Sequence, residues 1–197
     1  MDFGGMVSLF PVDEVRSREF LRFEYVDEQG WDQSCGYAAL ATLLSRFRKV
    51  ETDEASLVAR SAGTKDGQQV VKVSLAELVR LVRDLGLTAR PWKVGFDRLP
   101  ALLEASAPLL VHFDRPQGHF ALLLSAGSLG VVTADPARGL ELLTKEQFLG
   151  RWSGAAVEVL DGGNPWQGQD LVERVVKTVE GRAMLVNWAL SHPAGSR

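Results

Sequence analysis

The chain has 197 residues, 46% hydrophobic and 24% charged, which suits one domain with a buried core and is too short for two full domains. Its 22 basic and 25 acidic side chains give a net charge near -3, so we expect no nucleic-acid partner, because phosphate binding requires a basic surface. No apolar run reaches the roughly 18 to 20 residues of a transmembrane helix, so we expect a soluble protein.

The N-terminus and the cysteine content bear on the compartment. The first ten residues lack the basic leader and apolar core of a secretory signal, so we expect a cytoplasmic protein, or a periplasmic or secreted one if a signal has been trimmed. The single cysteine, Cys35, excludes an intramolecular disulfide and a zinc site of several thiolates. The sequence indicates neither a metal nor a cofactor.

The first predicted elements lead to this cysteine. Residues 20–26 alternate between apolar and charged side chains, the period-two pattern of a half-buried strand. After a polar, glycine-containing stretch, apolar residues recur at helical spacing from Cys35 to about Phe47. We therefore expect a strand, then a helix that starts at Cys35.

Two helices should follow. Thr52 is expected to cap a helix that ends at about Ala62. The next helix opens with Ser74 and Glu77, which are spaced as a capping box, and ends at Gly86.

The second half of the chain is richer in strands. We expect strands near 87–94, 108–113, 119–125, 129–134 and 155–160, and helices near 98–104 and 145–152. Because helices come first and no βαβ alternation follows, the order favours an α+β fold with an antiparallel sheet packed against helices. We expect residues 1–160 to form this domain, and residues 161–197 to form a linker (161–168) and a helical extension (about 169–190).

Cys35 has the placement of a nucleophile. Unpaired amides and the macrodipole at a helix N-terminus favour the thiolate, which is the reactive form of cysteine. Gly36 and the two alanines after it would let another layer of the fold or a substrate backbone come close to the helix start. A small buried hydrophobe is the other explanation of a lone cysteine.

A thiolate of this kind needs a base, and the chain offers His112, His119 and His192. His119 begins an apolar strand after the turn that contains Gly118, so its ring can stand at a sheet edge facing a helix. His112 lies inside a strand and His192 lies in the C-terminal tail. We therefore prefer His119.

Two further residues could complete a catalytic site. Asp135 ends the strand after that of His119 and could fix the imidazole tautomer, although an Asp-Pro pair also starts turns. Gln29, six residues before Cys35, could donate to a developing oxyanion together with the Cys35 amide. A surface loop glutamine is the ordinary alternative.

The segment from Gln29 to Leu40 resembles the active-site motif of the bacteriocin-processing, double-glycine peptidase family, with its Gln six residues before a Cys-Gly pair. His119-Phe120 resembles the histidine strand of that family, and Asp135-Pro136-Ala137 resembles its aspartate turn. The segment from Phe148 to Gly154 resembles its closing helix and strand. The resemblance spans about residues 20–160.

This resemblance implies a papain-like fold and cleavage after a Gly-Gly pair in the leader of a secreted peptide, through a thioester acyl-enzyme. Cys35, His119 and Asp135 would form the triad, and Gln29 would help to bind the oxyanion. Many members are fused to a membrane exporter. This chain is similar to the stand-alone members, so association with an export system is an expectation.

Substrate binding is assigned to Trp31, Asp32, Gly36 and Gly118. Trp31 could form an aromatic wall that admits only glycine, and Asp32 would shape the site or the substrate. Two alternatives stay open. Papain-like amidases and transglutaminases share the same order of catalytic residues, and a leader-binding module without turnover would share the same fold.

Overall fold

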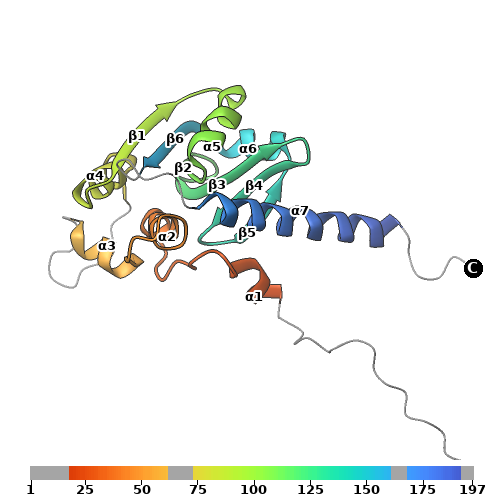
Figure 1. Cartoon of the computed structure of the whole chain (residues 1–197), viewed down its shortest axis with the longest axis horizontal. Helices are drawn as coiled ribbons and strands as arrows, with labels where there is room; N and C mark the ends of the chain where they lie inside the picture. The colour runs from red at the N-terminus through yellow and green to blue at the C-terminus, as the bar shows by residue number, and fades with distance from the viewer. Residues whose placement is uncertain (1–17, 62–72, 161–167, 192–197) are drawn as a thin grey trace, which may run out of the picture.

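The computed structural model describes residues 18–61, 73–160 and 168–191 (Figure 1). Its helices are α1 (Arg18–Phe23), α2 (Cys35–Thr42), α3 (Glu54–Arg60), α4 (Leu75–Asp84), α5 (Leu99–Ser106), α6 (Lys145–Arg151) and α7 (Gln169–Ser191), with a π-helical turn η1 (Leu43–Phe47) and a 3-10 turn η2 (Phe96–Arg98). Its strands are β1 (Thr88–Lys93), β2 (Leu109–Phe113), β3 (His119–Gly127), β4 (Gly130–Asp135), β5 (Gly139–Leu143) and β6 (Trp152–Leu160).

The strands form one six-stranded sheet in the order β1-β6-β2-β3-β4-β5. Every neighbouring pair is antiparallel. Helices α2, α5 and α7 pack on β3, which lies inside the sheet. The predicted α+β class with an antiparallel sheet packed against helices is confirmed.

Helix α2 is the central helix of the core. All eight of its residues are buried, because β3 and β4 contact one side of it and α3 and α4 contact it as well. Its sequence CGYAALAT is apolar all round, which is typical of a helix enclosed by protein. The first residue of α2 is therefore held firmly against the sheet.

The predicted strand at 20–26 is wrong, because the chain forms helix α1 there. A short alternating run does not separate a strand from a helical turn, and tertiary contacts decided the outcome. Arg182 of α7 donates to the Leu21 carbonyl at 3.0 Å, and Arg22 Nε donates to the Arg138 carbonyl at 2.8 Å. Arg182 thus satisfies a backbone carbonyl of α1, and Arg22 ties α1 to the turn between β4 and β5.

Other differences are smaller. Asp53, not Thr52, caps α3, since its carboxylate accepts from the Ser56 amide at 2.7 Å. Ser74 caps α4 as predicted, but the Glu77 carboxylate pairs with Arg80, so no reciprocal capping-box bond is seen. Strand β5 was not predicted, and most of the proposed linker lies outside the described residues.

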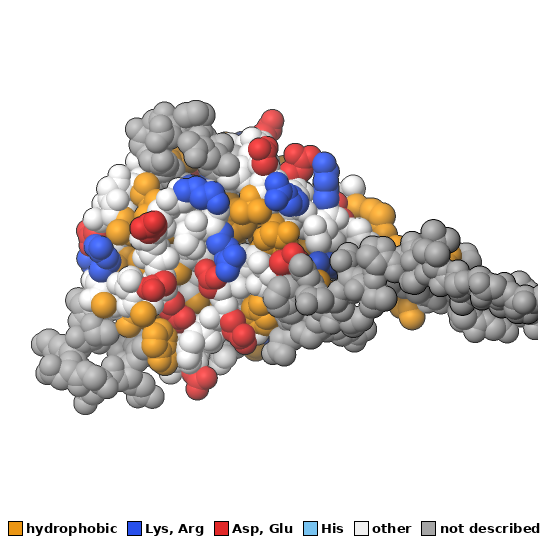
Figure 2. All heavy atoms as spheres, turned by 60° about the horizontal axis from the view of Figure 1, so that its bottom comes forward, with side chains coloured by type: hydrophobic (Ala, Val, Ile, Leu, Met, Phe, Trp, Pro, Cys, Tyr) orange, Lys and Arg blue, Asp and Glu red, His pale blue; other side chains and the backbone are white. Residues whose placement is uncertain are grey.

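Helix α7 begins against the sheet and runs past its edge (Figure 1). Its first half buries Val172, Val175 and Val179, whereas Leu185 and Leu190 further along are exposed. Charged side chains of both signs are interspersed with apolar ones on the face seen in Figure 2. In the parts of the chain that the structure describes, no helix combines the length and apolar character needed to cross a membrane.

Candidate active site

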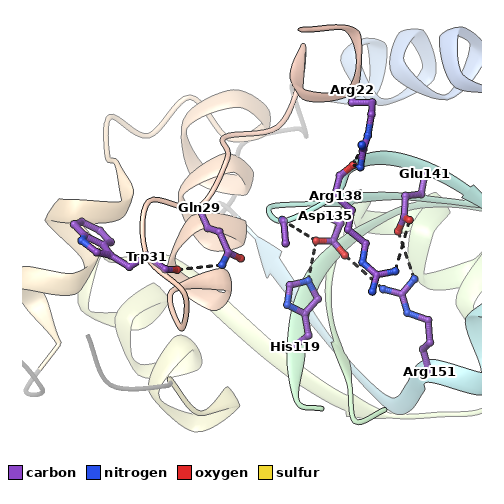
Figure 3. Close-up of polar contacts among 9 residues, drawn as sticks. Arg22, Gln29, Trp31, His119, Asp135, Arg138, Glu141 and Arg151 are labelled. Atoms are coloured by element: carbon purple, nitrogen blue, oxygen red, sulfur yellow. Dashed lines mark hydrogen bonds and ion pairs between the residues drawn. The ribbon is translucent and has the colours of Figure 1, made fainter. Parts of the chain in front are cut away.

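Three side chains that are distant in the sequence meet where α2 begins. Cys35 is the first residue of α2, His119 the first of β3 and Asp135 the last of β4. Because β3 and β4 are adjacent and antiparallel, the start of β3 lies beside the end of β4. His119 Nε2 lies 2.8 Å from Asp135 Oδ1 (Figure 3), and the imidazole and the Cys35 thiol lie close enough to shift each other's pKa.

The Cys35 sulfur is surrounded by groups that favour a thiolate. Burial raises the pKa of the thiol, but the hydrogen bond and the charge of His119 lower it. The backbone amides of Phe120 and Gly36 lower it further, and the net pKa lies below the ordinary thiol value. The side chain of Ser34, the N-cap, leaves the first turn uncapped, because it donates to a loop carbonyl at 2.7 Å.

His119 is stabilised as a cation from two sides. Burial lowers the pKa of the imidazole, but the hydrogen bonds to Asp135 and Cys35 and the charges of both raise it to about 9. The Phe113 ring lies nearly parallel to the imidazole, at 13° and with 6.4 Å between centroids. The lowered pKa of Cys35 and the raised pKa of His119 both favour a thiolate beside an imidazolium.

Asp135 is fully buried, and one of its oxygens has two partners. Oδ1 accepts from His119 Nε2 and, at 2.8 Å, from the Ala137 amide. Burial raises the pKa of this carboxyl, but His119, the Ala137 amide and the charge of Arg138 together hold it below its usual value. The same carboxylate therefore both starts the Asp-Pro turn and holds the imidazole.

Gln29 is anchored beside this turn. Its backbone amide donates to the Pro136 carbonyl at 3.0 Å, which ties the loop before α2 to the end of β4. Its side-chain Nε2 donates to the Trp31 carbonyl at 3.1 Å (Figure 3). Oε1 is buried and accepts no hydrogen bond within the described chain. An amide nitrogen carries two protons, so the second one stays available to a ligand.

The remaining predicted site residues lie on two segments, the loop before α2 (Trp31 and Asp32) and the turn before β3 (Gly118). Trp31 is 46% exposed, Asp32 is exposed and Gly118 is half-buried directly before His119. Of the other two histidines, His112 lies in β2 with Nδ1 3.1 Å from Ser153 Oγ, and His192 lies outside the described residues. Within the described ranges, no three His, Cys, Asp or Glu side chains are grouped to bind a metal ion.

Gly36 allows α2 to approach β3, and replacing it by alanine should therefore be costly. A Cβ there would overlap Val73 Cγ1 and lie 3.0 Å from Phe120 Cδ2. We expect overpacking to cost about 1–3 kcal/mol, which exceeds the gain of about 1 kcal/mol from replacing glycine within a helix. Because the helix must shift away from His119, the pKa of Cys35 should rise. Urea unfolding and pH-dependent alkylation measure both effects.

Gly181 in α7 provides the matched control. A Cβ added at this glycine would meet no atom of the described chain within 4 Å beyond its chain neighbours and the adjacent helix backbone, so Gly181→Ala should stabilise the protein by up to about 1 kcal/mol and leave alkylation unchanged. A Gly36→Ala protein as stable and as reactive as the wild type would show that close packing at this glycine is unnecessary.

Arg151, at the end of α6, was not predicted as part of the site. Its Nη2 lies 3.5 Å from Asp135 Oδ2 and its Nη1 lies 3.4 Å from Glu141 Oε2 (Figure 3). In sequence it is one of many arginines, and nothing in its spacing relates it to β4. The only local feature of Arg151 in the sequence is its place in the last turn of a helix, where basic residues are common, and this does not indicate a contact with Asp135.

Cys35 and Asp135 are buried, His119 is half-buried beside both, and the three meet at the start of a core helix, an arrangement that fits the papain-like peptidase fold. Residues 23–162 match the model of the Peptidase C39 family. The chain belongs to this family of peptidases.

Relatives and solved structures agree with the assignment. The chain is 32% identical over 164 residues to a probable functional amyloid protease, FapD, of Pseudomonas fluorescens, covering 81% of this chain and 70% of that protein. It is 27% identical over 158 residues to the colicin V secretion/processing ATP-binding protein CvaB of Escherichia coli, covering 78% of this chain and 20% of that protein. A double-glycine motif protease from an AMS/PCAT transporter, solved with its leader peptide, shares the fold, with a TM-score of 0.56, 20% identity and coverage of 68% and 89%.

Proposed function

We propose that the protein is a cysteine peptidase that cleaves a leader peptide after a Gly-Gly pair and forms a thioester intermediate. The observation that carries the proposal is that Cys35, His119 and Asp135 meet at the start of α2, with His119 hydrogen-bonded to Asp135 and lowering the pKa of the Cys35 thiol. Its electrostatics are those of a thiolate nucleophile paired with an imidazolium acid.

The proposed reaction begins with attack of the Cys35 thiolate on the scissile carbonyl carbon. A C–S bond forms, and the carbonyl π electrons move to oxygen. As the oxyanion collapses, the C–N bond breaks and the His119 imidazolium protonates the leaving amine. Neutral His119 then removes a proton from water, which attacks the thioester. The peptide acid leaves, and the thiolate and imidazolium are restored.

The oxyanion requires preorganised donors. The Cys35 amide, at the uncapped start of α2, and the free proton of Gln29 Nε2 are the proposed pair. Rotation of the Gln29 side chain away from the Trp31 carbonyl would allow its second N–H to point toward the oxyanion. Asp135 would hold His119 in the tautomer that can face the sulfur.

Specificity for glycine is proposed to come from the loop before α2 and the turn before β3. Trp31, Asp32 and Gly118 lie on these segments, and Gly36 follows Cys35 at the start of α2. A leader with small residues at the cleavage point would approach Cys35 closely. The double-glycine protease and the secretion/processing protein named above support this substrate class, and an association with an export system.

A second substrate class is favoured by one observation. The match covers 70% of the FapD protein of Pseudomonas fluorescens but only 20% of CvaB. FapD is described as a probable functional amyloid protease. A secreted protein of an amyloid system is therefore the second candidate. Synthetic leaders from both classes, with and without the Gly-Gly pair, separate the two.

The test of the proposed chemistry is alkylation of Cys35 by iodoacetamide as a function of pH. Because the pKa of Cys35 is lowered, half-maximal reactivity should lie below the ordinary thiol value near 8.5, and His119→Ala should move it upward. Cleavage should also decline above about pH 9, as His119 loses the proton that it gives to the leaving amine. A thiol of ordinary pKa, indifferent to His119, contradicts the proposal.

A further inference from the structure

The carboxylate of Asp135 has two unequal oxygens. Oδ1 accepts from His119 and from the Ala137 amide, whereas Oδ2 is buried and accepts no hydrogen bond within the described chain. An ionised carboxylate with no exposed surface is costly unless a charge compensates it. The guanidinium of Arg151, 3.5 Å from Oδ2, is too distant for a hydrogen bond and close enough for an ion pair.

Arg151 is itself held in place. Its side chain is only 17% exposed, and its Cζ lies 4.4 Å from the centroid of the Phe113 ring. Its second nitrogen faces Glu141 at 3.4 Å, and its carbonyl accepts from the Asp114 amide at 3.0 Å. Phe113 pairs with His119 across β2 and β3, so the guanidinium rests on the ring that lies beside the imidazole.

We propose that Arg151 is a positioning residue, which keeps the buried Asp135 carboxylate ionised and turned so that Oδ1 faces His119. The inference rests on the proposed function, because it assigns Arg151 a part in preparing the same imidazole. Charged groups reach Asp135 from every neighbouring element: His119 from β3, Arg138 from the β4–β5 turn, and Arg151 from α6. Glu141 of β5 faces Arg138 and Arg151, and Cys35 of α2 faces His119.

Arg151→Gln distinguishes a positioning role from a simple charge effect, because the two predict opposite changes in the pKa of His119. Removal of a nearby cation that did nothing else would raise the pKa of His119, since imidazolium would lose a repulsive neighbour. Loss of positioning would let Asp135 turn away or become protonated, so the pKa of His119 should fall by about 1 unit or more from its value of about 9. NMR titration of the labelled His119 ring measures this sign directly.

Cleavage provides the second measurement. We expect kcat of Arg151→Gln to fall about 100-fold with KM nearly unchanged, because a misdirected imidazole affects the reaction and not binding. Arg151→Lys keeps one charge but cannot contact Asp135 and Glu141 together, so its His119 pKa should lie between those of wild type and Arg151→Gln. Arg151→Lys also provides the test if Arg151→Gln does not fold. A pKa in Arg151→Lys equal to wild type would overturn the inference.

Arg138→Gln is the matched comparison. It removes an equal charge that also lowers the pKa of Asp135, but its side chain is 48% exposed and its ion pair, at 3.9 Å, is with Glu141 and not with Asp135. Its His119 pKa should change by less than half as much. A rise, or no change, in the His119 pKa of folded Arg151→Gln would overturn the inference. Failure of the proposed function is distinguishable, since wild-type Cys35 would then have an ordinary pKa and be indifferent to His119→Ala.

Discussion

Cys35→Ala is expected to abolish cleavage of a Gly-Gly leader, with a loss of at least about 10⁴-fold, and to leave the fold intact. Without the sulfur no thioester can form, and neither His119 nor water at the site replaces a preorganised thiolate. Because Cys35 is small and 6% exposed, alanine fits the same space at the start of α2. Mass spectrometry of a synthetic leader, at enzyme concentrations high enough for single turnover, measures the loss.

The control for this variant is binding of the same leader. Cys35→Ala should bind the leader with nearly wild-type affinity, because the groups assigned to substrate recognition are unchanged. Since Cys35 is the only cysteine, a mass shift of the wild-type protein by one thioester-linked fragment identifies the nucleophile without ambiguity. Residual cleavage by Cys35→Ala within 10-fold of wild type would refute thiol catalysis. If neither protein cleaved the leader but both bound it, binding without turnover would be the remaining role.

Asp135→Asn is expected to lower kcat by about 10³- to 10⁴-fold. The amide has nearly the shape of the carboxylate, but it has no charge to stabilise imidazolium, and its NH₂ group would face either the Ala137 amide or the Arg151 guanidinium. The pKa of His119 should therefore fall from about 9 toward its ordinary value, and that of Cys35 should rise. The thiolate–imidazolium pair then occupies a narrower pH range.

Glu158→Gln is the matched control for loss of a buried carboxylate. Glu158 is 4% exposed and accepts from Trp92 at 2.6 Å and from Ser106 at 2.8 Å, on strand β6 and away from the site. Its amide variant should lose stability of about 1–3 kcal/mol, yet keep the wild-type pH profile of alkylation. If Asp135→Asn changed stability alone and left the profile in place, Asp135 would be structural.

The shifted pKa values of His119 and Asp135 also predict how the stability of the folded protein depends on pH. His119 has a raised pKa in the folded protein, so its contribution is full below about pH 6.5 and is lost as pH rises through about 9. The lowered pKa of Asp135 acts in the opposite sense, and its contribution is lost as the pH falls below its ordinary value. The folded protein is therefore best stabilised by this pair between the two limits.

Much of the fold was predictable from local pattern. Continuous apolar runs located β2, β3 and β4, which are buried over consecutive residues, and helical spacing and cap signals located most helices. Strand β5 was missed since it is short and follows the tight turn at Gly139, whose φ is +77°. At 20–26 the alternation was real, but residues 18–23 form helix α1, which contacts α7 through Arg182 and the β4–β5 turn through Arg22.

The sequence by itself determined the residue types, their order and the helix that presents Cys35, because helix start signals and apolar periodicity are local properties. Only the tertiary structure decided that His119 and not His112 meets the sulfur, that Asp135 directs one oxygen to the imidazole, and that Arg151 stands behind the other. These relations depend on which strands are neighbours and on side-chain directions within a packed core. Such non-local distances and burial set the pKa values, and no spacing along the chain encodes them.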